Sequence, residues 1–141
     1  MLIQEYDGAS RCSFGHPPGA GSLLVTVPCL IEGLQRTQFA LLDTAAEWCT
    51  LPGNIAEFLG LDLTPDPAVR PYLTRLGAFF GRLERLSLTL IATEGEEVQV
   101  EATFFICRDW PGPIVVGWKG CLERIRFGLD PSSDTWYFAS L

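Results

Sequence analysis

The sequence lacks a long apolar run and a recognisable leader, and these absences remove membrane and secreted classes of protein. No apolar stretch approaches the ~20 residues that a membrane-spanning helix needs. The first ten residues, MLIQEYDGAS, contain two acids and no apolar segment, which is unlike a signal peptide. We therefore expect a cytoplasmic protein without a membrane partner.

Positive charge is also scarce, and this argues against a nucleic-acid partner. The chain has 10 Lys and Arg against 17 Asp and Glu, a formal net charge of −7. A protein that binds nucleic acid needs a basic stripe, because neutralising phosphates supplies most of the affinity. The densest basic segment, residues 70–85, has its charges dispersed among apolar residues.

Histidine and close cysteine pairs are almost absent, so the sequence predicts neither a metal site nor a cofactor. The five cysteines are odd in number and form no CxxC pair. The only spacing that loosely resembles zinc ligation joins Cys12 to His16, with Cys107 and Cys121 far along the chain, whereas zinc sites usually contain two close pairs. We expect reduced, buried thiols and a loop histidine.

Familiar catalytic motifs are missing as well. The chain contains no GxSxG, GxxxxGK[ST], GxGxxG or HExxH sequence. Its single histidine, His16, lies between glycine and proline, and a serine or cysteine nucleophile needs a base held nearby in fixed geometry. A cysteine–histidine enzyme is therefore disfavoured.

The chain does contain residue patterns typical of β-strands, and its length and apolar content fit a single domain. Hydrophobic residues make up 48% of 141 residues, enough for one core without metals or disulfides. Leu23, Val25 and Val27, followed by Cys29 and Ile31, place apolar residues at every second position, which is typical of a half-buried strand. Seven or eight such strands and one or two short helices predict an all-β, closed or folded antiparallel barrel over residues 22–141. Residues 1–21, rich in Gly, Pro and Ser, are expected to form a flexible N-terminal arm.

Asp43 is the first candidate for chemistry. It follows Phe39–Leu42, an apolar segment that has lost its alternation and is expected to be a buried strand end. A lone carboxylate is costly to bury, so this one either forms hydrogen bonds in an Asx-type turn or is kept for function. The residue alone leaves both interpretations open.

Three segments together carry a family resemblance. The segment 41–46, LLDTAA, resembles the Asp-Thr/Ser-Gly-Ala signature of retropepsin-like aspartic proteases. The segment 114–117, IVVG, is similar to the second signature of that family, and residues 72–82 lie where its flap hairpin is expected. The segments occur in family order, and the resemblance covers about residues 22–139.

The resemblance implies a barrel of the acid-protease type and a homodimeric aspartic endopeptidase acting on a peptide or protein substrate. Each subunit supplies one catalytic carboxylate, Asp43, from a loop that includes Thr44 and Ala45, with the threonine hydroxyls bracing the two loops. Two carboxylates a few ångströms apart share one proton, so that one activates water and the other hydrogen-bonds the scissile carbonyl.

Substrate contacts follow from the same resemblance. Glu47 matches a carboxylate that grips the substrate backbone, and Val116 belongs to the second signature. Gly77, Ala78, Phe79 and Phe80 are expected in the flap, with both phenylalanines at the tip of the loop Gly77–Gly81. An ordinary hairpin connection, with the phenylalanines folded back on the barrel, is the alternative.

Two positions depart from the family pattern. Ala45 stands where the family usually has glycine, and alanine is tolerated there only at negative φ. Trp118 and Lys119 follow the second signature, where many relatives have an arginine paired with the acid that corresponds to Glu47. An inactive module that dimerises or binds peptides is therefore the alternative function, and a monomeric β-barrel that binds a ligand is the third.

Overall fold

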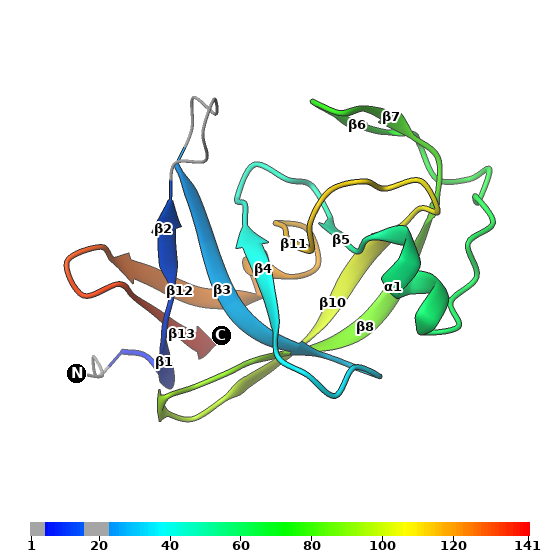
Figure 1. Cartoon of the computed structure of the whole chain (residues 1–141). Helices are drawn as coiled ribbons and strands as arrows, with labels where there is room; N and C mark the ends of the chain where they lie inside the picture. Colours follow the sequence, from blue (N-terminus) through cyan, green and yellow to red (C-terminus); the bar gives the residue numbers. More distant parts are fainter. Residues whose placement is uncertain (1–4, 16–22) are drawn as a thin grey trace.

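The computed structural model describes residues 5–15 and 23–141, and its centre is a closed barrel of six strands (Figure 1). In barrel order these are β3 (Leu24–Ile31), β4 (Gln38–Leu42), β11 (Val115–Val116), β5 (Cys49–Thr50), β10 (Val98–Ile106) and β8 (Arg82–Leu90). Pairing of β8 with β3 closes the barrel. The predicted all-β barrel is confirmed, although β11–β4 and β10–β5 pair in parallel, which makes it a mixed barrel.

A second sheet contains both terminal parts of the described chain. Its strands lie in the order β12 (Ile125–Asp130), β13 (Thr135–Ser140), β1 (Gly8–Arg11) and β9 (Glu94–Gly95). The short β2 (Ser13–Gly15) adds to the edge of β3. Residues 8–11 and 13–15 of the expected N-terminal arm thus form strands, because β13 and β3 offer them strand edges that no local pattern reveals; residues 1–4 and 16–21 lie outside the described part.

Helical structure is limited and agrees with the prediction of one or two short helices. The helix α1 (Gly53–Phe58) follows β5, and the 3₁₀ helix η1 (Leu122–Arg124) precedes β12. In the described residues no helix is both long and apolar enough to cross a membrane. Two further strands, β6 (Tyr72–Thr74) and β7 (Gly77–Phe79), form a separate hairpin that projects from the barrel beside β8 (Figure 1).

The apolar side chains form two clusters rather than one. The larger fills the barrel and the space between the barrel and the terminal sheet. The smaller contains buried Phe105, Cys107, Trp110 and Val115 and lies beneath the hairpin. All five cysteines are buried and free, as the sequence predicted for small apolar core residues. The hairpin thus rests on its own cluster, next to the loop that follows β4.

Candidate active site

The loop that carries Asp43 connects β4 to β5, and β11 lies between those two strands. Val115 and Val116 of β11 pair with Leu41 and Leu42 of β4, while Val115 also pairs with Thr50 of β5. The amide of Asp43 donates to the carbonyl of Val116 at 3.0 Å. The two predicted signatures are therefore joined directly, and the ladder fixes the backbone from which the carboxylate projects.

Asp43 organises the turn that follows it. Its Oδ1 accepts a hydrogen bond from the amide of Ala45 at 2.9 Å, and its carbonyl accepts one from the amide of Ala46 at 3.2 Å. This is the Asx-type turn that the sequence left open as one interpretation. Asp43 is half-buried, Thr44 and Ala45 are exposed, and Oδ2 of Asp43 has no hydrogen-bond partner within the described residues. The turn therefore uses one carboxylate oxygen and leaves the other unbonded within the described residues.

The alanine at position 45 causes no backbone strain. In the described part of the chain Asp134 is the single non-glycine residue with positive φ, so Ala45 has the negative φ that a methyl group requires. The departure from the glycine of the family signature is therefore accommodated by the backbone.

Gly117 supports the loop from below and cannot be replaced without a shift. A Cβ at this position would lie 2.4 Å from the carbonyl oxygen of Trp48 and 2.9 Å from that of Ala46. On the far side of this contact the amide of Trp118 donates to Ala46 at 2.8 Å, and that of Lys119 donates to Glu47 at 2.8 Å. The second signature needs its glycine because two backbones meet there.

Buried thiols lie under the same contact. Sγ of Cys49 accepts a hydrogen bond from the amide of Gly117 at 3.4 Å and a second one from the thiol of Cys121. That bond, together with burial, raises the pKa of Cys121. Burial, with a smaller contribution from Cys49, raises the pKa of Cys29 to about 12. The thiols of Cys29 and Cys121 therefore stay protonated at neutral pH, whereas the hydrogen bonds from Cys121 and Gly117 lower the pKa of Cys49.

The ion pair that many relatives form near this loop is replaced by another contact. Nζ of Lys119 lies 5.4 Å from the centroid of the Trp48 ring, a cation–π geometry, and the two described ion pairs both belong to Arg82 instead. The exposed carboxylate of Glu47 therefore has no ion-pair partner within the described residues. It is left available on the surface of the loop.

The hairpin differs from the predicted flap in where it turns. Thr74 pairs with Gly77, so the turn is Arg75–Leu76 rather than Gly77–Gly81. The Thr74 hydroxyl accepts the amide of Leu76 at 3.0 Å and donates to the carbonyl of Gly77, whose φ is +122°. A threonine three residues before a glycine is the local signal that sequence reasoning missed.

The two phenylalanines are consequently not at the tip. Phe79 lies in β7 and packs edge-on against Trp110, with ring centroids 5.2 Å apart, while Phe80 follows the strand and is 62% exposed. Gly77 and Ala78 lie on the hairpin and are exposed. The prediction that both rings form the tip is wrong, because a strand pairs Phe79 with Tyr72 and places both on the barrel side.

Val116 does not line the site. Its side chain is fully buried in the main core, because β11 is a barrel strand between β4 and β5 and Val116 packs in the main cluster. Its contribution is the carbonyl that holds Asp43, and the predicted substrate contact is replaced by this structural role.

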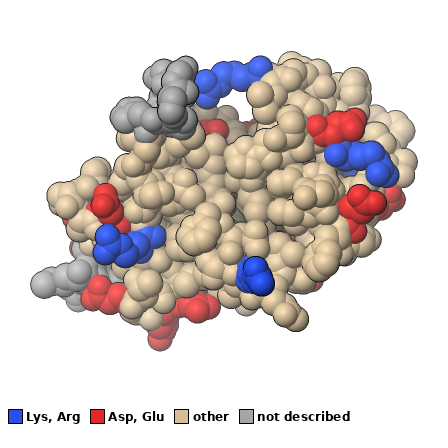
Figure 2. All heavy atoms as spheres, in the orientation of Figure 1, with Lys and Arg blue, Asp and Glu red and all other residues tan. Residues whose placement is uncertain are grey.

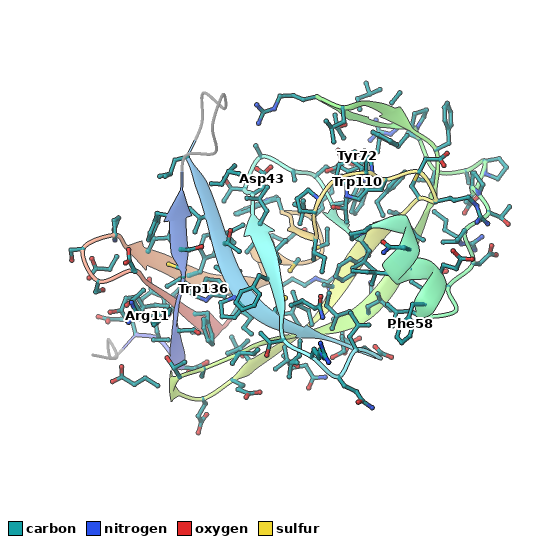
Figure 3. The ribbon with its side chains drawn as sticks, in the orientation of Figure 1. Arg11, Asp43, Phe58, Tyr72, Trp110 and Trp136 are labelled. Carbon is teal, nitrogen blue, oxygen red and sulfur yellow. The ribbon has the colours of Figure 1, made fainter. Side chains whose placement is uncertain are left out.

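The region above Asp43 is open to solvent. Figure 2 shows the surface hollowed beneath the hairpin tip and above the end of β4, and acidic atoms are visible on its floor where Figure 3 labels Asp43. Figure 3 also labels Tyr72 and Trp110 beneath the hairpin, which sequence reasoning did not single out. The loop forms the floor of this hollow and the hairpin its roof.

The described surface away from Asp43 has an open groove but no group of residues suited to a metal. Within residues 5–15 and 23–141, no group of three or more His, Cys, Asp or Glu could hold a metal, and His16 lies outside those residues. An open groove of about 580 Å³ is formed by β3, β8 and β10. It includes Glu32, Ser87 and Glu101 but none of the predicted site residues.

Comparison with known proteins supports one fold. No family model matches the chain, and neither does any curated protein. Among solved structures it is similar to the crystal structure of a retropepsin-like aspartic protease from Rickettsia conorii. The identity is 21% and the TM-score 0.60, over 92% of this chain and 97% of that one. The arrangement of the two signatures, the hairpin and the barrel is therefore that of a retropepsin-like aspartic protease fold.

Proposed function

We propose that the chain is one subunit of a homodimeric aspartic endopeptidase, in which two Asp43 carboxylates activate water. The observation that carries the proposal is the state of Asp43: its backbone is fixed by Val116, one oxygen is held by Ala45, and the other has no hydrogen-bond partner within the described residues. Rigid placement of a carboxylate with one free oxygen is what general acid–base catalysis requires.

The dimer follows from the chemistry. Each chain supplies one such carboxylate, and hydrolysis without a covalent intermediate needs a second group that donates a proton to the scissile carbonyl. Two carboxylates across a two-fold axis hold one proton between them, because both cannot ionise cheaply at short distance. The ionised partner takes a proton from water as the water oxygen attacks the carbonyl carbon, and the other donates its proton to the carbonyl oxygen. In this proposal the exposed Thr44 of each subunit braces the paired loops through its hydroxyl.

The substrate that fits this site is an extended peptide or protein segment lying between the Asp43 loop and the hairpin. Extended peptides bind strand-like edges through main-chain hydrogen bonds, and the hairpin presents Gly77 and Ala78 without bulky side chains. Exposed Glu47 offers a carboxylate to a backbone amide or a basic group. Ala45 is compatible with the proposal because its φ is negative.

The decisive experiment replaces Asp43 by Asn in the full chain. We expect peptide hydrolysis to fall by about 10³-fold or more, because the general base is lost, while circular dichroism and mass in sedimentation are unchanged. The matched control is Asp134→Asn, which alters the only other Asp-Thr pair, in the turn between β12 and β13, and should leave turnover intact.

Retained hydrolysis in Asp43→Asn would refute the catalytic assignment. A wild-type chain that dimerises and binds peptides but hydrolyses none would instead identify the non-catalytic module. A chain that stays monomeric at all concentrations would contradict the peptidase and the dimerisation module, since each needs a second copy, and would favour the monomeric β-barrel that binds a ligand.

A further inference from the structure

The hairpin β6–β7 is a two-stranded sheet with no neighbour on either edge within the described residues. An isolated hairpin of this length is marginally stable in water, so its position depends on side chains that attach it to the barrel. Opposed residues on a hairpin share a face, and Tyr72 pairs with Phe79 while Leu73 pairs with Ala78. The first pair faces the barrel and the second faces solvent, since Leu73 is 76% exposed.

Two aromatic contacts attach the barrel-facing pair. The ring of Phe79 packs on Trp110, and the ring of Tyr72 packs on Phe105 with centroids 5.1 Å apart. Phe105 belongs to β10, which pairs with β5 at the end of the Asp43 loop. Both contacts are at the root of the hairpin, so the turn at Arg75–Leu76 extends beyond them.

Tyr72 makes one contact that Phe79 does not. Its hydroxyl oxygen accepts a hydrogen bond from the backbone amide of Trp48 at 3.4 Å. Trp48 is the last residue before β5, five positions after Asp43 in the same loop. One side chain therefore joins the roof of the hollow to its floor.

The phenol also retains its own proton for donation. Burial raises the pKa of Tyr72, and the negative charges of Asp43 and Glu47 raise it further. Because the amide of Trp48 is the donor in their bond, the O–H of Tyr72 is not used by this contact. The contact between Tyr72 and Trp48 is thus a hydrogen bond between two neutral groups.

We propose that Tyr72 is the positioning residue of this site, holding the hairpin at a fixed height above the loop through the amide of Trp48. This inference rests on the proposed peptidase function for its kinetic consequences. Tyr72 bonds to the Trp48 end of the loop and not to Asp43, so it acts on how a peptide is held rather than on the proton transfer. Its loss should raise KM and leave kcat nearly unchanged.

The test compares Tyr72→Phe with wild type, because phenylalanine keeps the ring on Phe105 and removes only the hydroxyl. We expect amide exchange at Trp48, followed by NMR, to accelerate about three- to tenfold, the size expected for the loss of one neutral hydrogen bond. KM should rise by a similar factor, with kcat within about twofold. Tyr72→Ala should add rapid exchange throughout residues 72–79. Tyr6→Phe is the matched control, since Tyr6 stacks on Tyr137 of the terminal sheet.

The outcomes separate this inference from the proposed function. Unchanged Trp48 exchange in Tyr72→Phe overturns the positioning role whatever the enzyme does, and so does a fall in kcat at constant KM. Faster Trp48 exchange in a chain without peptidase activity supports the tie between hairpin and loop, and removes only the peptidase. Recovery of slow hairpin exchange in Tyr72→Phe relative to Tyr72→Ala shows that the ring and the hydroxyl act separately.

Discussion

The hairpin β12–β13 and the hairpin β6–β7 are attached to the barrel in different ways. In the terminal sheet, β13 pairs with β12 on one edge and with β1 on the other. Trp136 of β13 is completely buried. Within residues 5–15 and 23–141, β6 and β7 pair only with each other, and Leu73, Leu76 and Phe80 are exposed there. One hairpin is part of the core, and the other is attached to it by two rings.

The two hairpins should therefore differ in what they affect: β12–β13 the global stability of the chain, and β6–β7 the local opening next to the candidate site. Segments with few buried contacts and unpaired edges open at low free energy, and elements that must admit a ligand come from that class. The hairpin lies over the Asp43 loop and the terminal sheet does not, so the weakly held hairpin is the one next to the candidate site (Figure 3). Changes in the terminal sheet should therefore affect global unfolding, and changes in β6–β7 should affect local opening.

The largest effect is expected for Trp136→Ala. Removing a fully buried indole leaves a large cavity, so we expect the free energy of unfolding to fall by about 3–5 kcal/mol, measured by urea denaturation at fixed protein concentration. The control is Leu129→Ala, which alters the residue opposite Trp136 on β12 but is 40% exposed, and should cost less than about 1 kcal/mol. Equal losses in the two variants would show that the terminal sheet is not part of the core.

An intermediate effect is expected for Phe79→Ala. Without its contact to Trp110 the hairpin root loosens, so hydrogen exchange in residues 72–79 should become fast while global stability falls by only about 1–2 kcal/mol. Leu73→Ala on the solvent face of the same hairpin is the control and should change stability by no more than about 0.5 kcal/mol. A loss in Phe79→Ala as large as that in Trp136→Ala would remove the contrast between the two hairpins.

The smallest effect concerns Cys29 on β3, in the barrel to which both hairpins attach. Its pKa is raised from 9.0 to about 12 by burial, so above pH 9 the unfolded chain loses this proton while the folded chain keeps it. The unfolded state then binds fewer protons, and stability falls as pH rises from about 9 toward 12, by at most ~1.4 kcal/mol per unit. Denaturation at about pH 8 and about pH 10 should show a smaller loss in Cys29→Ala than in wild type. Parallel losses would mean that Cys29 is not desolvated.

Local sequence patterns predicted the barrel and the loop because each signal lies within a few residues. Alternation along 23–31 predicted β3, and an apolar pair before Asp43 predicted a carboxylate at a strand end. The strand β1 could not be predicted, because Gly8–Arg11 become a strand only by pairing with β13 about 125 residues later. The turn of β6–β7 was misplaced because the glycines at 77 and 81 suggested a loop between them, and only the pairing of Thr74 with Gly77 places the turn at Arg75–Leu76.

The sequence by itself determined which groups are available: one carboxylate after a buried strand, a glycine where two backbones meet, thiols small enough for the core, and an apolar pattern of period two. These follow from steric size, charge and periodicity, which are properties of single residues and their neighbours. Only the tertiary structure decided that Val116 holds Asp43 by its carbonyl, that Phe79 faces the barrel, and that Tyr72 reaches the amide of Trp48. Those contacts join residues far apart in the chain, and closing the barrel is what brings them within bonding distance.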